Sequence, residues 1–577
     1  MNSFARSFFA SLLALVVLLA LIVGIAALKL DHKTKIENHT FLVVDLYGAL
    51  PEYDAPGDVV SQALGGEGET LQRVLSNLEK ARVDKRIEGV ILKLSSNFEA
   101  GAASLEEIRN ALKKVQKADK PVYGFADSIN PRCYFLAAVC DSIYAPPSAY
   151  ITFHGFSETL PFVKGSLEKL GVKPNLHRIK DYKAAAELVT RKNLSDAARE
   201  NLQWMLDETW DLFTQSLQED RGLSEDQVKS IMELAMLTPE EAVEHRLVDR
   251  LLYWDEMADQ FKLEKDERLR TVSQSRYAEV KEQKLGLNKG KKYVAVIHAH
   301  GLIGGRESGV DPLLGTMMGH DTVVAQLDRA RRDKNVVAIV FRVDSGGGDS
   351  LTSDLIGHAV DRAAQEKPVV VSMVDVAASG GYSISYRGTK IVADPGTITG
   401  SIGSISGKFN LAGLFEKLGI SFDGVSKGPM ALFDSSFRDY TPQERERFEK
   451  EHWAGYNTWV ADIAKHRGMS VDEVSRLAEG REWSGRQAAE NGLVDELGDL
   501  DHAVALAKKL AEVPQDKKVA VRHFPQKQDF LQMVFSSEEE LSLGVRAAVI
   551  RQFRAQWKES LNLLANAQLR LAPLATP

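Results

Sequence analysis

Two glycine-rich segments in the second half of the chain carry residues suited to acyl-transfer chemistry. Asp-Ser-Gly-Gly-Gly (344–348) follows the apolar run VAIVFRV, and Ala-Ala-Ser-Gly-Gly (377–381) follows VVVSMV. A serine between small residues, where a strand turns into a helix, exposes its hydroxyl beside uncovered backbone N–H groups. Ser379 is therefore a candidate nucleophile. The glycines at 346–348 let a second backbone approach and offer another N–H.

Other interpretations of the same residues remain open at this point. The hydroxyl of Ser379 would also suit a helix N-cap. Glycine-rich loops after strands also bind phosphate, although neither a P-loop lysine nor a GxGxxG pattern is present. His298 and His300 share one face of a predicted strand, but without an acidic or cysteine partner set we expect them to be structural rather than metal ligands.

The base that such a serine needs is suggested by an internal repeat. DVAASGGY (375–382) matches DSINPRCY (127–134), and IVADPGTITGSIG (391–403), FEKLGI (415–420) and NGLVDEL (491–497) match earlier segments at nearly the same spacing. In this alignment Ser379 lies opposite Pro131, and Lys183 lies opposite Pro429. Each half has lost what the other keeps, which predicts one Ser–Lys site divided between two halves.

Lysine acts as a base only when it is neutral, so Lys183 requires a pKa far below its ordinary value. Burial away from carboxylates has this effect. The neighbouring run Ala184–Ala186 is small and apolar. We therefore predict that Asp181 and Glu187, the nearest acidic residues in sequence, point away from Lys183.

The elements that must position these residues alternate between β-rich runs and amphipathic helical stretches in both halves, which is typical of parallel strands in an α/β fold. The predicted organisation is a transmembrane anchor (1–30), an N-terminal repeat with Lys183 (40–262), a charged linker (263–290), a C-terminal repeat with Ser379 (291–515) and a mostly helical extension (516–577) with a short strand signal, VAVRHFP.

Composition and hydropathy narrow the function classes. A net charge of −8 and a pI near 6.0, with scattered basic residues, give no footprint for nucleic acid. Residues 8–28 contain no charged side chain and are long enough to span a bilayer as a helix. The residues after them form a poor cleavage site, so we expect an uncleaved anchor. Flanking charges do not decide its orientation.

Taken together, DVAASGGY, TGSIG (399–403), DYKAAAE (181–187), GLVDELG (492–498) and the two-copy layout resemble the signal peptide peptidase A (protease IV) family of the Clp-protease/crotonase-like superfamily. The resemblance runs from the anchor to about residue 510. It implies that Ser379 is the nucleophile, Lys183 the general base and Ser401 the hydroxyl that orients the lysine. Gly380 and either Gly347 or Gly348 would donate N–H groups to the oxyanion. The family usually has Ser-Pro-Gly-Gly where this chain has Ser345–Gly348, so which glycine donates stays open.

The resemblance further implies a serine endopeptidase that needs no cofactor or metal and cleaves apolar peptides, among them signal peptides already released from preproteins. It implies a homo-oligomer, a tetramer, held in the bacterial inner membrane with its catalytic region on the periplasmic side. Two rivals remain: a crotonase-like acyl-CoA enzyme, which would use the paired N–H groups for an enolate, and a non-catalytic membrane scaffold. The retention of one complete Ser–Lys set favours the peptidase.

Overall fold

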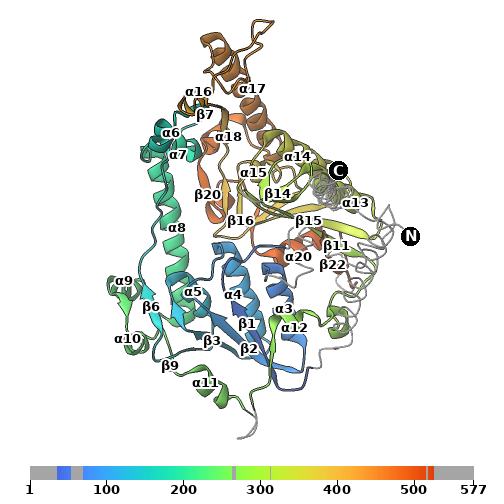
Figure 1. Cartoon of the computed structure of the whole chain (residues 1–577). Helices are drawn as coiled ribbons and strands as arrows, with labels where there is room; N and C mark the ends of the chain where they lie inside the picture. The colour runs from blue at the N-terminus through green and yellow to red at the C-terminus, as the bar shows by residue number, and fades with distance from the viewer. Residues whose placement is uncertain (1–35, 54–68, 263–267, 312–313, 515–516, 526–577) are drawn as a thin grey trace, which may run out of the picture.

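The computed structural model describes residues 36–53, 69–262, 268–311, 314–514 and 517–525, which are coloured in Figure 1. Within these residues, two parallel β-sheets form the centres of two α/β units, one for each predicted repeat. In Figure 1 the sheet of the first half (blue) lies below that of the second half (yellow to red), while the teal part of the first half rises beside the second at the left. The α/β fold with two repeats is confirmed.

The two main sheets have matching strand orders, and all the pairs along both orders are parallel. The first is β10-β1-β2-β3-β5-β9, and the second is β22-β11-β15-β16-β17-β21. The first comprises β1 (Thr40–Leu46), β2 (Ile87–Leu94), β3 (Val122–Ala126), β5 (Ser142–Ala145), β9 (Arg250–Leu251) and β10 (Thr271–Ser273). The second comprises β11 (Tyr293–His300), β15 (Val336–Ser345), β16 (Val369–Ala378), β17 (Lys390–Ala393), β21 (Glu496–Leu497) and β22 (Ala520–Phe524).

Shorter strands form smaller pairings around these sheets. They are β4 (Ser128–Ile129), β6 (Tyr150–Phe153) and β8 (Ala235–Leu237) in the first unit, and β12 (Leu302–Ile303), β13 (Gly309–Asp311), β14 (Gly315–Met318), β18 (Ile398–Gly400) and β20 (Glu482–Ser484) in the second. β18 pairs with the end of β16 and with β20. β7 (Lys173–Ile179) and β19 (Ser404–Asn410) form a separate two-stranded sheet.

Helices cover both faces of the second sheet, as its strand pattern requires. In β11, Ala295 and Ile297 pack in one buried cluster with α13 and α14, whereas Val294 packs on the opposite face in a cluster with α20. The helices of this half are α13 (His320–Arg332), α14 (Ser350–Ala364), α15 (Gly380–Ser383), α16 (Ala412–Lys417), α17 (Pro442–Arg467), α18 (Val471–Ala478), α19 (Gly485–Glu490) and α20 (Leu500–Leu510).

The first half repeats this arrangement. Its helices are α3 (Leu71–Val83), α4 (Ala102–Gln116), α5 (Pro131–Ala137), α6 (Lys164–Leu170), α7 (Glu187–Thr190), α8 (Asp196–Arg221), α9 (Glu225–Glu233), α10 (Pro239–Glu244), α11 (Trp254–Gln260) and α12 (Gln274–Ala278), with 3-10 turns η1 (Ala184–Ala186) and η2 (Glu282–Leu285). The long helices α8 and α17 correspond to each other: each has 26 residues, begins at a Ser or Thr cap and ends at a left-handed glycine, Gly222 or Gly468.

Two predicted boundaries are wrong. Residues 263–290, expected to be a linker, supply β10 at the edge of the first sheet and α12, whose Tyr277 is fully buried. The second repeat extends past residue 515, because β22 pairs with β11 at the equivalent edge. An edge strand of three residues leaves little hydrophobic pattern in a charged segment, so composition concealed β10. VAVRHFP does contain the predicted strand.

Two predicted regions lie outside the described residues: the anchor at 1–30, including the apolar run 8–28, and most of the extension, from 526 to 577. None of the helices that the structure describes is long and apolar enough to cross a membrane.

Three sets of contacts join the two halves. β7 of the first half pairs antiparallel with β19 of the second over their whole length. Asp375 of β16 accepts hydrogen bonds from the N–H and hydroxyl of Ser104 at the start of α4. Arg342 of β15, fully buried, pairs with Glu52 and Glu107 of the first half. These contacts place β15 and β16 against the unit that carries Lys183.

Candidate active site

Ser379 lies at the sharp turn between β16 and α15, in an unusual backbone conformation. Its φ of 56° and ψ of −117° are strained for a residue with a side chain. Although Ser379 occupies the N-cap position of α15, its hydroxyl makes no capping hydrogen bond. The helix-cap interpretation is therefore wrong, and the hydroxyl is left for other chemistry.

Ser401 lies beside Ser379 on the neighbouring strand. β16 and β18 run parallel with Ala378 opposite Gly400, and the Ser379 N–H donates to the Gly400 carbonyl at 2.9 Å. Ser379 directly follows β16 and Ser401 directly follows β18, and neighbouring strands lie about 4.8 Å apart. Ser401 also has a left-handed φ, of 49°. Both strands thus end in a turn that carries a serine to the same edge of the sheet.

Lys183, from the other half of the chain, reaches this edge. Its Nζ donates to the Ser401 carbonyl oxygen at 2.9 Å and lies 3.0 Å from Ser401 Oγ. The contact joins residues 218 positions apart in the sequence. The structure thus joins Lys183 to Ser401, which follows the strand beside Ser379. Among the described residues, no hydrogen bond joins Lys183 directly to Ser379.

The backbone around Lys183 explains how it arrives there. β7 pairs with β19 up to Ile179 opposite Ser404, and the Tyr182 N–H donates to the Glu479 carbonyl at 3.1 Å. Two glycines pack directly against Lys183: an added Cβ on Gly403 or Gly480 would lie 3.0 or 2.8 Å from Lys183 Cβ. The final glycine of TGSIG therefore has a steric role, since any side chain there would push the lysine away.

Lys183 is buried, with 9% of its surface exposed. This burial lowers the pKa of its amine from 10.5 to about 8, and the Glu482 carboxylate opposes that shift. Asp181 is 85% exposed on its side chain and faces Arg178, and the Glu187 carboxylate pairs with the same arginine. Both therefore point away from Lys183, as predicted. Sequence reasoning missed Glu482, because nothing marks a carboxylate three hundred positions away as a neighbour.

The glycine loop after β15 packs against the turn at Ser379. Gly347 has a φ of 102°, and a Cβ added to it would lie 2.5 Å from Gly380 N and 2.9 Å from Ser379 Cβ. Its own N–H donates to Ser345 Oγ at 3.2 Å. Among the described residues, by contrast, the N–H groups of Gly348 and Gly380 have no hydrogen-bond partner. The sequence did not mark Ser345 as a site residue, yet its hydroxyl oxygen accepts the N–H of Gly347, one of the two candidate oxyanion donors.

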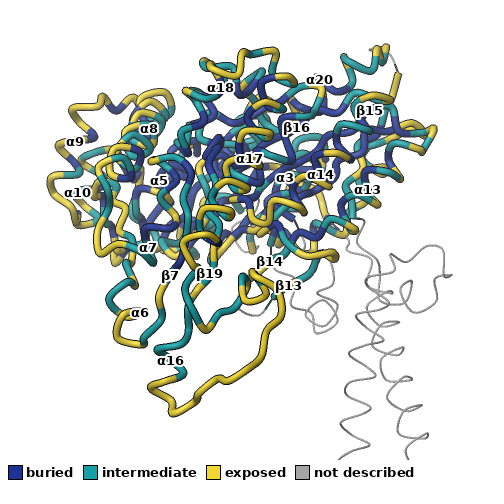
Figure 2. Tube along the Cα trace, turned by 90° about the horizontal axis from the view of Figure 1, so that it is seen from above, coloured by how far each residue is buried: buried dark blue, intermediate teal, exposed yellow. Residues whose placement is uncertain are grey.

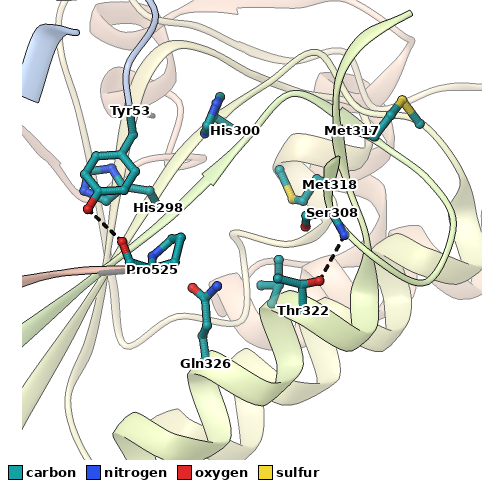
Figure 3. A pocket seen from close by; sticks show the side chains of 10 residues that line it. Tyr53, His298, His300, Ser308, Met317, Met318, Thr322, Gln326 and Pro525 are labelled. Carbon is teal, nitrogen blue, oxygen red and sulfur yellow. Dashed lines mark hydrogen bonds between the residues drawn. The ribbon is translucent and has the colours of Figure 1, made fainter. Parts of the chain in front are cut away.

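A separate small pocket involves both predicted histidines and none of these residues. Figure 3 shows His298, His300 and Tyr53 on one side and Met317, Met318 and Gln326 on the other. His298 is buried, stacks on Tyr53 and contacts His523 at 2.9 Å. In the described part of the chain no group of His, Cys, Asp or Glu is arranged to hold a metal ion. His298 therefore lies in the core, whereas His300 is only partly buried.

Comparison with known proteins agrees with the duplicated architecture. Residues 114–268 and 361–514 each match the model of peptidase family S49. The chloroplastic serine protease SPPA of Arabidopsis thaliana is 33% identical over 459 residues, covering 79% of this chain and 68% of that protein. Protease 4 of Salmonella typhi is 30% identical over 498 residues, covering 82% of this chain and 79% of that protein. The chain therefore belongs to peptidase family S49, and the protein is a serine protease.

Proposed function

We propose that the protein is a membrane-anchored endopeptidase in which Ser379 is the nucleophile and Lys183 the general base. The observation that carries this proposal is the cross-repeat contact of the buried Lys183 amine with Ser401, on the strand that runs beside Ser379. Ser401 would orient the amine. The strained turn at Ser379 supports the same assignment, because its hydroxyl is not used by the helix that follows.

The chemistry follows from these positions. Neutral Lys183 takes the proton from Ser379 as its Oγ attacks the peptide carbonyl, and the resulting ammonium gives that proton to the leaving amine. This step leaves an acyl-enzyme on Ser379. A water molecule, deprotonated by the again neutral Lys183, then attacks the ester. As the acyl product leaves, the Lys183 ammonium returns its proton to Ser379 Oγ, which restores the serine and the neutral amine. With a pKa near 8, about a fifth of Lys183 is neutral at pH 7.4, against about one in a thousand for an ordinary lysine.

The developing oxyanion would be held by the N–H groups of Gly380 and Gly348. Gly380 N–H is at the start of α15, where the helix offers it no internal partner. Gly348 is favoured over Gly347 as the second donor, because Ser345 already accepts the Gly347 N–H. Gly347 would then serve by permitting close approach of the two loops.

We propose apolar peptides, in particular signal peptides left after preprotein processing, as substrates, and the bacterial inner membrane as the location, with the catalytic region on the periplasmic side. The resemblance to the signal peptide peptidase A family and the uncharged run at 8–28 support both.

We also propose that the protein is a homotetramer. The segment after α16 exposes several large apolar side chains, which is typical of a surface that another chain covers. They are Leu418 (63% exposed), Ile420 (45%), Phe422 (50%), Val425 (104%) and Leu432 (47%). Figure 2 shows this exposed loop projecting below the body near α16. Light scattering of the detergent-solubilised full chain measures the assembly, and a monomer would refute it.

The decisive experiment on the proposed function compares the full-length protein with Ser379→Ala and Lys183→Ala in hydrolysis of a peptide thioester. Each single change should abolish turnover while the oligomer stays intact and the protein stays folded. A serine-directed fluorophosphonate should label the wild type and not Ser379→Ala. Substantial activity in Lys183→Ala would show that the base is elsewhere.

A further inference from the structure

A second titratable group, Glu482, interacts electrostatically with Lys183, and the mechanism above does not use it. Glu482 is the first residue of β20 and pairs with Gly400, the residue before Ser401. Two positions earlier, the backbone of Gly480 packs on Lys183 so closely that an added Cβ would lie 2.4 Å from Lys183 N. The segment from 480 to 482 therefore forms one wall of the lysine site.

The Glu482 carboxylate is held in place by a reciprocal pair of hydrogen bonds. Asn201 Nδ2, from α8 of the first half, donates to Glu482 Oε2 at 3.2 Å, and the Glu482 N–H donates to Asn201 Oδ1 at 3.1 Å. Asn201 is itself buried, with 6% of its surface exposed. Glu482 is half-buried, and a carboxylate withdrawn from water is costly unless a cation compensates it. Among the described residues, however, Glu482 forms no ion pair within hydrogen-bonding distance.

The other charged groups on the surrounding elements are already paired with one another. The pairs are Lys180 with Glu479, Arg481 with Glu200, and Arg178 with Asp181 and Glu187. The nearby titratable rings are also engaged: Tyr182 with Glu200, Tyr456 with the Ile402 carbonyl and His452 with Ser404. On β16, Asp375 is bonded to Ser104. Among the described residues, Glu482 is thus the carboxylate whose charge acts on Lys183 without an ion-pair partner of its own.

We propose that Glu482 is a positioning residue of the site, whose carboxylate is the counter-charge for the protonated amine of Lys183. The inference rests on the proposed function, since it concerns the proton that Lys183 takes from Ser379. The electrostatics agree with it in both directions: Glu482 raises the pKa of Lys183, and Lys183 lowers that of Glu482, each against the larger effect of burial.

The role differs between the resting enzyme and the transition state. The amine is neutral before the reaction and becomes positive as Ser379 attacks, so a fixed negative charge stabilises the transition state more than the ground state. The same charge makes Lys183 more basic, which reduces its neutral fraction at low pH. Asn201 contributes by holding the carboxylate, so that no reorganisation is needed during proton transfer.

Glu482→Gln tests the proposal, because the amide keeps the shape and can still accept from Asn201. The measurement is kcat/KM against pH for the full-length protein with a peptide thioester. The wild type should lose activity as the pH falls through about 8. In Glu482→Gln this acidic limb should move to lower pH by about 1 unit, the size of shift that a neighbouring charge produces. Activity on the alkaline plateau should fall about tenfold for the same reason.

Asp181→Asn is the matched control. It removes the same charge only two positions from Lys183, but from a side chain that is 85% exposed. Solvent screens that charge, so the limb should stay where it is in the wild type. An unmoved limb in Glu482→Gln would overturn the proposal, because a purely structural role would lower activity equally at every pH.

Further readouts separate the possible failures. If Lys183→Ala keeps its activity, the proposed function fails, whereas an unmoved limb in Glu482→Gln with an inactive Lys183→Ala refutes only the role of Glu482. Should Glu482→Gln not fold, Glu482→Asp decides, since a carboxylate set one methylene back should move the limb in the same direction by less. The rate of fluorophosphonate labelling at Ser379, measured against pH without any peptide substrate, should also have its acidic limb at lower pH in Glu482→Gln than in the wild type.

Discussion

Replacing Gly347 by alanine would test whether the glycine loop holds the oxyanion donors in place. Its φ of 102° is unfavourable for alanine, and the new Cβ would lie 2.5 Å from Gly380 N and 2.9 Å from Ser379 Cβ. Ordinary contacts of a Cβ begin at 3.4 Å. One of the two loops must therefore move by about 1 Å, the scale of misplacement that is costly to catalysis.

The expected loss follows from the group that is displaced. Movement of Gly380 takes one N–H away from the oxyanion, and losing one such donor costs about 2.7–4 kcal/mol, or roughly 100- to 1,000-fold in kcat. Because the donor acts on the transition state, KM should change much less than kcat. The measurement is steady-state thioester hydrolysis, with the unfolding midpoint recorded to verify that the protein is folded.

Gly346→Ala is the matched control, one residue earlier in the same loop. Nothing lies within 4 Å of an added Cβ at Gly346, and its φ is not in the left-handed region. Its kcat should stay within about twofold of the wild type, since it adds a methyl group to open space. If Gly347→Ala retained more than about a tenth of wild-type kcat, the loop would not position the oxyanion donors as we argue.

Three further outcomes are expected. In the wild type, kcat/KM should fall about tenfold per pH unit below the Lys183 pKa of about 8; a profile flat down to pH 5 would contradict a lysine base. Lys183→Met should be inactive yet more stable, because the folded-state pKa of Lys183 lies below the ordinary 10.5 and folding therefore opposes its protonation. The gain in the free energy of unfolding, measured by urea titration, should reach about 3 kcal/mol below pH 8 and vanish above about pH 10.5. Equal stability of variant and wild type at pH 7 would contradict this prediction. Arg342→Met should lower the free energy of unfolding by about 3–5 kcal/mol, because it leaves Glu52 and Glu107 buried without their cation. The control Arg332→Met, at a side chain 69% exposed, should cost less than about 0.5 kcal/mol. Similar losses in the two variants would refute the pairing argument.

Much of the fold could be predicted because its signals are local. Runs such as VAIVFRV are buried on both faces, and this requires continuous apolar residues that are visible in any single stretch. The repeat was visible for the same reason, since two copies of one unit keep similar residues at similar places. The edge strands β10 and β22 were harder, because three to five residues at the rim of a sheet need little apolar character.

Within the candidate site, the residue types could be identified from local sequence: a serine among small residues at a strand end, a lysine before an alanine run, and a glycine-rich loop. Their reciprocal loss from the two repeats suggested one divided site. Tertiary structure alone decided how they meet. The antiparallel pairing of β7 with β19 carries Lys183 across to Ser401, and Asn201 of α8 holds Glu482 beside it. Such contacts depend on how two distant backbones pack, and neither spacing nor composition records that arrangement.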